Sequence, residues 1–249
     1  MRQITWIKEY MAENVPGAAW DAKADFALRL CMKCADDACT RYVLDAADTF
    51  IRADGCTPAN AKALFFALEK TGEDKYREAI CRVKEQLEDQ PEAADAPLSE
   101  LYETLPFRMA YEMKLNRMEK VGATAAMFRS AHQRLWDRKT GMHGDSLQEE
   151  GWFLLAMTDA IAVCSDQLYE HWRAMVDIYR ETLRGVLPLL ADADAQTMTL
   201  LLYALLTGVE MGLIDPERYL PVARKGIAAL REKGSPCAAD TLEEGFGVL

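Results

Sequence analysis

The chain has 249 residues, of which 50% are hydrophobic and 28% are charged, a composition typical of a soluble globular protein. Forty acidic residues against 29 basic ones give a formal net charge of -11, which argues against nucleic acid or an anionic membrane as the main partner. The longest apolar run, "TMTLLLYALLTGV", is too short to cross a bilayer, and the first residues show no apolar stretch typical of a leader peptide. Seven cysteines in such a chain suit a reducing compartment, so we expect a cytoplasmic protein without a disulfide framework.

Apolar residues recur with helical spacing along nearly the whole chain, and no alternating run indicates a strand. Two of the expected helix starts carry a specific pattern, because Thr57 and Asp215 each precede a proline and are expected to be N-cap residues. Gly72 is expected to end the first of these helices, and Pro221 is expected to interrupt the second. The spacing predicts eleven helices, at residues 2–13, 20–34, 38–53, 58–71, 74–89, 98–115, 118–135, 149–164, 167–187, 194–212 and 216–232.

Two kinds of helix alternate along the chain. Helices with one apolar face begin near Tyr42, Tyr76, Tyr169 and Tyr219, and more uniformly apolar segments such as "AKALFFALEK" lie between them. A helix that is apolar all round is buried, and one with a single apolar face lies outside. The alternation predicts an all-α fold, an (α/α)6 barrel of inner and outer helices, formed by residues 1–249 as one domain in which the first or last helix can be trimmed. A superhelix of the tetratricopeptide type is the alternative, which the irregular repeat disfavours.

Few motifs in the sequence indicate a metal or a cofactor. Cys31 and Cys34 have the spacing of a zinc half-site, but no second pair follows, so we expect no metal site. His132 and His171 lie on polar helix stretches and are expected to be solvated, whereas His143 lies in the loop "TGMHGDS", where a functional role and a turn-forming role both fit. The chain contains no nucleophile elbow, phosphate-binding loop or dinucleotide fingerprint, so no cofactor is expected.

Carboxylates are the remaining candidates for chemistry. Glycoside hydrolysis needs acids placed across a cleft, with pKa values set apart by their surroundings. Helix N-termini attract acids without any catalysis, so a solvated cap is the simpler explanation for each acid near an expected helix start. These acids are Asp54, Glu100, Glu103, Asp145, Glu149, Glu150, Asp192 and Asp194.

Five segments follow one another in a distinctive order, namely "ANAKALFFALEKTGEDKYREAICRVKEQL", "ELYETLPFRMAYEMKLN", "LWDRKTGMHGDS", "EEGWFLLAMTDAI" and "MTLLLYALLTGVEMGLIDPERYLPVARKGIAAL". Together they resemble the unsaturated glucuronyl and rhamnogalacturonyl hydrolases of glycoside hydrolase families 88 and 105. In that family the segments correspond to a helix pair, a Leu-Tyr-Met-x-x-Pro-Phe helix, a His-Gly loop, a Gly-Trp helix and a late inner helix with its outer partner. The resemblance covers residues 40–235 and implies an (α/α)6 barrel.

The resemblance also implies an unusual reaction, in which an aspartate protonates the C4=C5 double bond of an unsaturated uronic acid and water adds at C5. The family's acid stands seven residues before the proline of the Pro-Phe pair, and counting back from Pro106 gives Ser99, whose hydroxyl is too weak an acid for this step. Glu100 is adjacent, but one residue along a helix turns a side chain by about 100°. Glu103 lies one turn on and can share the face of Ser99, and Asp145 in the His-Gly loop is the third candidate acid.

Other positions depart from the family pattern as well. The family's Trp-Ala-Arg-Gly-Asn-Gly-Trp is "SLQEEGW" here, so Ser146, Gln148 and Glu150 replace its substrate-facing Trp, Arg and Asn. A glutamine in place of the arginine, with a glutamate nearby, makes a poor site for a uronate. The family's second acid is replaced by Cys56 and Thr57, and its Glu-Thr-Ser-Gly segment is "DAQT".

Two functions fit these observations. The favoured hypothesis is a weakly active or non-catalytic carbohydrate-related barrel, and the alternative is an active hydrolase of unsaturated uronyl oligosaccharides that uses Glu103, Glu100 or Asp145 as its acid. The expected partner is an oligosaccharide, not nucleic acid or a membrane, and the oligomeric state is left open. The residues expected to bind the ligand are Tyr102, His143, Glu150, Trp152 and Asp194, although His143 and Trp152 can equally serve packing.

Overall fold

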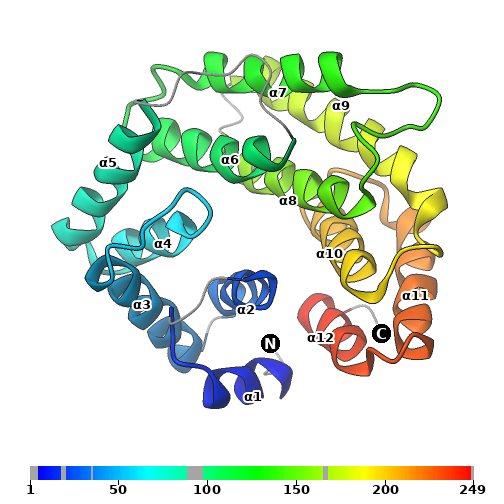
Figure 1. Ribbon diagram of the computed structural model, residues 1–249, viewed down its shortest axis with the longest axis horizontal. Helices are drawn as coiled ribbons and strands as arrows, with labels where there is room; N and C mark the ends of the chain where they lie inside the picture. The colour runs from blue at the N-terminus through cyan, green and yellow to red at the C-terminus, as the bar shows by residue number, and fades with distance from the viewer. Residues whose placement is uncertain (1–4, 18–20, 35, 89–97, 165–167, 248–249) are drawn as a thin grey trace. The chain divides into compact units, whose positions relative to one another are not determined.

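The computed structural model describes residues 5–17, 21–34, 36–88, 98–164 and 168–247 (Figure 1). This part of the chain contains twelve α-helices and a short 3-10 helix, and its one β feature is an isolated bridge between Asp137 and Met142. The all-α prediction is confirmed. The chain divides into two compact units, residues 1–92 and 93–249, and the assignment of residues 1–249 to one domain stays a prediction.

Five helices form the first unit. Each packs on the next along the chain, so that α3 lies between α2 and α4, and α4 also contacts α5. The apolar stripe of α3 is buried along its length, as the one-sided hydrophobic pattern of an outer helix requires. The helices are α1 (Thr5–Glu13), α2 (Ala22–Lys33), α3 (Asp37–Arg52), α4 (Ala61–Thr71) and α5 (Asp74–Glu88).

A buried carboxylate joins α2 to α4 in this unit. Asp25 is 5% exposed, and its carboxylate lies 2.6 Å from the Arg29 guanidinium and within contact of the Lys62 ammonium. Burial raises the pKa of the Asp25 carboxyl, but the two neighbouring positive charges outweigh burial and hold the pKa below its usual value. Removing one partner would leave the buried Asp25 with a single compensating charge, so the contact with Lys62 ties α4 to α2.

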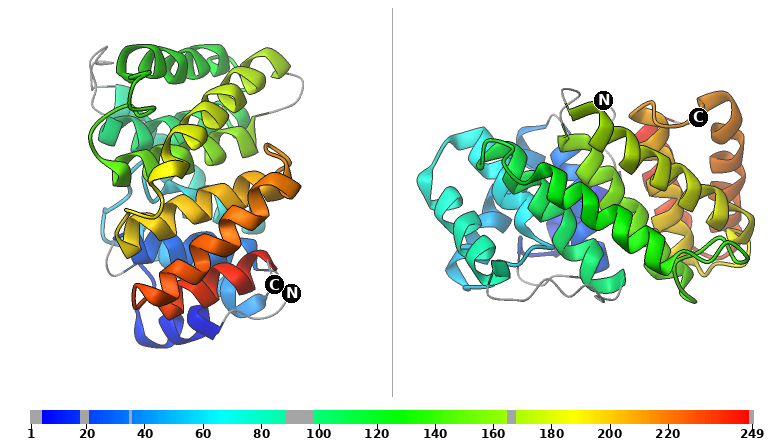
Figure 2. Two further views of the ribbon diagram at one scale, coloured as in Figure 1. Left: turned by 90° about the vertical axis from the view of Figure 1, so that its right-hand side faces the viewer. Right: turned by 90° about the horizontal axis from the view of Figure 1, so that it is seen from above.

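Seven α-helices form the second unit, and they lie in two layers (Figures 1 and 2). One layer runs through α6, α8, α10 and α12, each packed on the next, and the other contains α7, α9 and α11. The short 3-10 helix η2 (Leu187–Leu189) follows α9 directly. The α-helices are α6 (Leu98–Lys114), α7 (Val121–Leu135), α8 (Leu147–Val163), α9 (Tyr169–Val186), α10 (Ala195–Glu210), α11 (Pro216–Glu232) and α12 (Pro236–Phe246).

The centre of the second unit is made by α8 and α10, the two helices that the sequence marks as apolar all round. Both are buried over most of their length. They approach closely at Gly151, where an added Cβ would lie 3.1 Å from Cβ of Leu200. Gly151 therefore allows the close packing of α8 on α10.

One expected helix start and one expected helix end are confirmed, and another expected start is wrong. Asp215 caps α11, and Gly72 ends α4 in the left-handed conformation at φ 72°. Thr57 is not the N-cap of α4, which begins at Ala61 after Asn60. Asn60 Oδ1 accepts from the Thr57 N–H at 2.9 Å and Thr57 Oγ1 accepts from the Asn60 N–H at 3.4 Å, so these side chains hold a turn where a first helical turn was expected.

Two further expectations need correction. Pro221 does not interrupt α11, because the N–H that it lacks would reach the carbonyl of the exposed Glu217, where water can take its place. The final helix α12 was not predicted, although Pro236 at its first position is a helix-start residue. It buries Ala239 and Leu242, three residues apart, a pattern too short to stand out by periodicity.

Candidate functional site

The starts of α6 and α8 present a pair of aromatic side chains. Tyr102 from α6 and Trp152 from α8 stack with ring centroids 5.9 Å apart and planes 26° from parallel. Both side chains are half-buried, so packing holds the rings while part of their surface stays open to solvent. Aromatic rings offer a flat apolar surface with a polar tip, which suits a ligand that has both C–H faces and hydroxyl groups.

Two carboxylates flank this pair. Glu103 follows Tyr102 on α6 and is exposed, and Glu149 lies in the first turn of α8 and is half-buried. Burial raises the pKa of the Tyr102 hydroxyl, and the charges of Glu103 and Glu149 raise it further. The hydroxyl therefore keeps its proton at neutral pH and can donate a hydrogen bond. We refer to Tyr102, Trp152, Glu103 and Glu149 as the aromatic face.

The helix that carries Tyr102 also contains the position of the family's acid. Ser99 lies in the first turn of α6, and its side chain is outside the described residues. Glu100 is exposed, and α6 runs without a break through Pro106. Because proline has no N–H, Pro106 cannot donate the helical hydrogen bond to the carbonyl of Tyr102, four residues earlier. That carbonyl oxygen keeps a lone pair for another donor.

The loop between α7 and α8 is held against α9 by two glycines. Gly141 has a left-handed φ of 71°, and a Cβ added at Gly185 of α9 would lie only 1.8 Å from the Gly141 carbonyl oxygen. The loop is closed on itself where the Asp137 N–H donates to the Met142 carbonyl at 2.8 Å. This contact fixes the position of His143, the next residue along the chain.

His143 is the centre of a buried chain of hydrogen bonds that crosses the second unit. The Glu150 carboxyl accepts from the His143 backbone N–H and lies 2.9 Å from its Nδ1, and neither side chain has any exposed surface. His143 Nε2 lies 2.9 Å from Nδ1 of His132 on α7, whose Nε2 lies 3.2 Å from Oε2 of Glu181 on α9. We refer to Glu150, His143, His132 and Glu181 as the histidine chain.

Counting protons shows how the histidine chain is arranged. Its three hydrogen bonds between side chains need three protons, and two neutral imidazoles between ionised carboxylates supply two. Burial lowers the pKa of His132, and the neighbouring His143 lowers it further, so His132 does not carry the third proton near neutrality. In the arrangement with one proton on Nδ1 of each imidazole, the bond without a proton is the one to Glu181, whose side chain is 49% exposed, so that water can take part there.

The structure places five of the predicted residues in two sets and leaves three outside them, namely Glu100, Asp145 and Asp194. Tyr102, Trp152 and Glu103 belong to the aromatic face, whereas His143 and Glu150 belong to the histidine chain. Asp145 is exposed. Asp194 caps α10, where Thr197 donates to both carboxylate oxygens and these hydrogen bonds lower the pKa of the carboxyl. Within the described residues, no hydrogen bond or ring contact joins Asp145 or Asp194 to either set.

The expectation that His132 and His171 are solvated is wrong. His132 is in contact with the rings of His143 and Trp136, and His171 has a buried Nδ1 for which the described residues offer no partner. The sequence analysis missed His132 and Glu181 as members of the histidine chain. Their partners lie 11 and 49 residues away along the chain, so no local pattern could reveal the contacts.

Two findings bear on metals and membranes. In the parts of the chain that the structure describes, no group of three or more His, Cys, Asp or Glu side chains could hold a metal ion, and none of the seven cysteines forms a disulfide. Burial raises the pKa of the Cys31 thiol, and the nearby Cys39 raises it further, which keeps this thiol unreactive. None of the described helices is both long and apolar enough to span a membrane.

Solved structures similar to this chain include two glycoside hydrolases and a polysaccharide lyase. A family 105 glycoside hydrolase from C. acetobutylicum ATCC 824 superposes with a TM-score of 0.78 at 20% identity, covering 93% of this chain and 83% of that one. A family 88 glycosyl hydrolase from Bacteroides vulgatus gives a TM-score of 0.74 at 12% identity, with 92% and 83% covered. A polysaccharide lyase gives a TM-score of 0.60 at 14% identity, with 98% and 83% covered.

Neither a protein-family model nor a curated protein matches the chain. At these identities the likeness establishes the fold, which is the (α/α)6-barrel fold of family 88 and 105 glycoside hydrolases, as the sequence predicted. The fold is shared by proteins described as glycoside hydrolases and as a polysaccharide lyase, so the fold does not fix the reaction, which depends on the residues of the site.

Proposed function

We propose that this protein is a carbohydrate-binding relative of the family 88 and 105 hydrolases, which holds an uncharged oligosaccharide on the aromatic face and does not hydrate unsaturated uronides. The observation that carries the proposal is the stacked pair Tyr102–Trp152, with the charges of Glu103 and Glu149 acting on the Tyr102 hydroxyl. The fold supports the carbohydrate part of the proposal, and the residues at the start of α6 support the loss of the family reaction.

The aromatic face fits a neutral sugar ring. The exposed parts of the Tyr102 and Trp152 rings can pack on the C–H face of a pyranose, and the Tyr102 hydroxyl can donate to a ring substituent. The carboxylates of Glu103 and Glu149 are acceptors for sugar hydroxyl groups. The helical position that Pro106 leaves unfilled adds the Tyr102 carbonyl as a further acceptor.

The same carboxylates disfavour a uronate. A uronate carboxylate brought within about 4 Å of Glu103 or Glu149 meets a repulsion of roughly 1 to 4 kcal/mol, depending on how much water remains between the charges. The arginine that the family resemblance would place nearby is Gln148, which carries no charge to offset this repulsion. Ser99 stands where the family's acid would protonate the substrate, and serine cannot take that role.

Binding can be measured through the tryptophan itself. We expect a neutral oligosaccharide to change the fluorescence of the wild-type protein saturably, and the matching oligosaccharide with a terminal uronate to bind about tenfold more weakly or worse, since roughly 1.4 kcal/mol of repulsion corresponds to tenfold. Trp152→Ala removes the larger half of the stack and should abolish the binding, measured by titration calorimetry because the fluorescent reporter is then lost.

A second Tyr–Trp pair provides a matched control. Tyr169 and Trp172, on the first turn of α9, stack with centroids 6.1 Å apart and planes 26° from parallel, almost the geometry of the aromatic face. Both belong to one helix and carry no part of the proposed site, so Trp172→Ala should leave binding unchanged. Equal losses in the two variants, or tighter binding of the uronate form, would contradict the proposal.

The alternative function is hydrolysis with a relocated acid. Glu103 favours this alternative, because it lies on the aromatic face and acts electrostatically on the Tyr102 hydroxyl. In that case Glu103 would replace Ser99 as the proton donor to a substrate displaced by one helical turn. Turnover of an unsaturated uronyl oligosaccharide that depends on Glu103 would establish it.

A further inference from the structure

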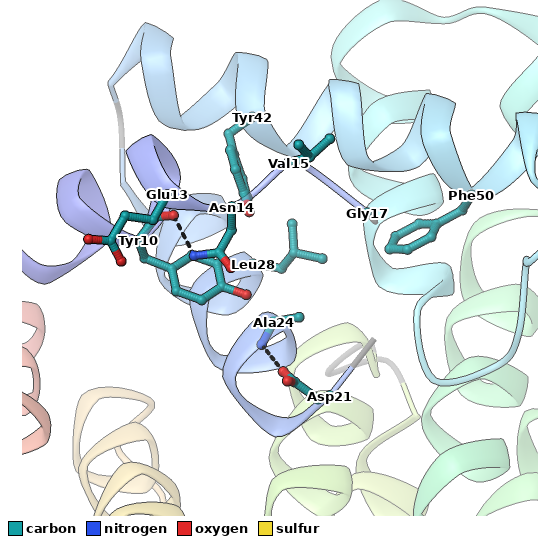
Figure 3. Close-up of a pocket in the computed structure, with 10 residues that line it drawn as sticks. All are labelled: Tyr10, Glu13, Asn14, Val15, Gly17, Asp21, Ala24, Leu28, Tyr42 and Phe50. Carbon is teal, nitrogen blue, oxygen red and sulfur yellow. Dashed lines mark hydrogen bonds between the residues drawn. The ribbon is translucent and has the colours of Figure 1, made fainter. Parts of the chain in front are cut away.

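The first unit contains a cavity that none of the sequence motifs indicated. Its volume is about 170 Å³, and it lies between α1, the start of α2 and α3 (Figure 3). An apolar cavity of about 150 Å³ accepts a ligand the size of benzene, so this one has room for a small organic molecule. The described residues that line it all fall between Tyr10 and Phe50, within the first unit.

Three aromatic side chains form much of its wall. In Figure 3 the Tyr10 ring from α1 and the Phe50 ring from α3 lie on opposite sides of the cavity, and Tyr42 of α3 lies above them. Tyr42 is 7% exposed and Phe50 is 4% exposed, so packing holds both rings in place. Aromatic rings that converge on a confined space attract a positive charge through the negative potential of their faces.

The polar groups of the cavity are mainly acceptors. Glu13 and Asp21 each contribute a carboxylate, and the Asn14 amide donates to the Tyr10 carbonyl at 2.9 Å. Asp21 uses Oδ1 to cap α2, where the Ala24 N–H donates to it at 2.8 Å, which offsets the partial positive charge of that helix end. None of the described residues that line the cavity is lysine, arginine or histidine, so its formal charge is negative.

The tyrosine hydroxyls do not change the negative formal charge of the cavity. Burial raises the pKa of Tyr10, and the charge of Asp21 raises it further. Burial also raises the pKa of Tyr42, with a second contribution from Tyr10. Both stay protonated at neutral pH, so they act as donors or acceptors for a ligand, while the negative charge comes from the two carboxylates.

We propose that this cavity binds a small organic cation, an ammonium group on a short organic chain, between the rings of Tyr10, Tyr42 and Phe50 and the carboxylates of Glu13 and Asp21. An anion would meet two like charges, and a neutral apolar ligand would gain nothing from the carboxylates. An ammonium group satisfies both the ring faces and the carboxylates. The proposal does not depend on the function proposed for the aromatic face.

The probe for a test is choline, with 3,3-dimethylbutan-1-ol as its uncharged counterpart of the same shape. Calorimetric titration of the full chain should show saturable binding of choline and none of the alcohol at the same concentrations. Asp21→Asn removes one charge but keeps the N-cap, since asparagine and aspartate cap helices about equally well. We expect it to weaken choline binding about tenfold, the scale of one desolvated charge contact.

Three controls separate the cavity from other effects. Asp36→Asn makes the same exchange at the N-cap of α3, where Asp36 accepts from the Ala38 N–H at 2.7 Å outside the cavity, and should leave choline binding unchanged. Glu13→Gln, at an exposed position, repeats the charge test if Asp21→Asn fails to fold. Trp152→Ala should leave choline binding intact. Equal affinity for choline and the alcohol, loss in Asp36→Asn as large as in Asp21→Asn, or no saturable binding of choline would overturn the proposal.

Discussion

Glu149 and Glu150 are neighbours in the first turn of α8, yet they lie in opposite environments. Glu149 is half-buried on the aromatic face and acts on the Tyr102 hydroxyl, whereas Glu150 has no exposed surface and holds the backbone and the ring of His143. Successive side chains on a helix point about 100° apart, so a single turn serves two surfaces.

This difference in burial distinguishes residues whose contacts stabilise the fold from residues that can be substituted to alter ligand binding. A fully buried carboxyl whose hydrogen bonds are lost is costly, so Glu150 is constrained by its partners in the histidine chain. Glu149 and Glu103 reach solvent and can be exchanged at little cost to stability. A protein of this fold can therefore lose or gain chemistry on the aromatic face while the histidine chain keeps α7, α8 and α9 in place.

The largest expected effect tests the contact between Gly141 and Gly185, which holds the loop between α7 and α8 against α9. Gly185→Ala places a Cβ 1.8 Å from the Gly141 carbonyl oxygen, which only a backbone shift can relieve. We expect a loss of roughly 3 kcal/mol or more in the free energy of unfolding, measured by urea denaturation. Gly144→Ala is the control in the same loop, since nothing lies within 4 Å of its added Cβ, and it should change stability by less than about 0.5 kcal/mol. A mild Gly185→Ala would show that the loop is not fixed by this contact.

The neighbouring glutamates give the most direct comparison of the two environments. Glu150→Ala leaves two buried donors of His143 without an acceptor, and we expect it to cost about 3 kcal/mol of unfolding free energy. Glu149→Ala, one residue away in the same turn, should cost less than about 0.5 kcal/mol. Similar costs in the two variants, measured under the same denaturation conditions, would remove the distinction.

The pH dependence of stability sharpens the comparison further. The pKa of His132 in the folded protein lies below its ordinary value of 6.5. The contribution of His132 to the free energy of unfolding is therefore fully present above pH 6.5 and is lost as the pH falls below 6.5 and through the folded pKa. Unfolding free energies at about pH 7.5 and about pH 5.5 should therefore differ in the wild type and differ less in His132→Asn. Asp25 does not affect this comparison, because its pKa is lowered and its contribution to stability is lost only below its ordinary pKa of 3.8. An unchanged slope in His132→Asn would contradict the assignment.

The smallest expected effect is a gain. Glu181→Gln supplies an amide N–H to the unprotonated Nε2 of His132, so all three hydrogen bonds between the side chains of the histidine chain are filled with neutral imidazoles. We expect a stability increase of about 0.5 kcal/mol at neutral pH, the lower end for one hydrogen bond at a partly exposed position. Glu170→Gln, an exposed glutamate in the first turn of the same helix, is the control and should show no gain. A loss of stability in Glu181→Gln would mean that the chain already holds its third proton.

Local patterns in the sequence predicted most of the helices, because apolar spacing, the Asp215 cap and Gly72 act over a few residues. The predicted start of α4 was wrong, because the Asn60 side chain accepts a hydrogen bond from the Thr57 N–H and the two residues form a turn. The aromatic face was partly predictable, since Tyr102 and Trp152 belong to segments that resemble a known family. The histidine chain was not, because Glu181 and His132 meet only through the packing of α7 on α9.

The central claim is that α6 keeps the aromatic wall of the family's helix but lacks its proton donor. The most direct test is to incubate the protein with an unsaturated uronyl disaccharide and follow the ultraviolet absorbance of the conjugated double bond, with a family 105 hydrolase as the positive control. We predict no loss of absorbance with the wild-type protein under conditions in which the control reaction is complete. Turnover that Glu103→Gln abolishes, while Glu149→Gln retains it, would contradict the account and establish the relocated acid.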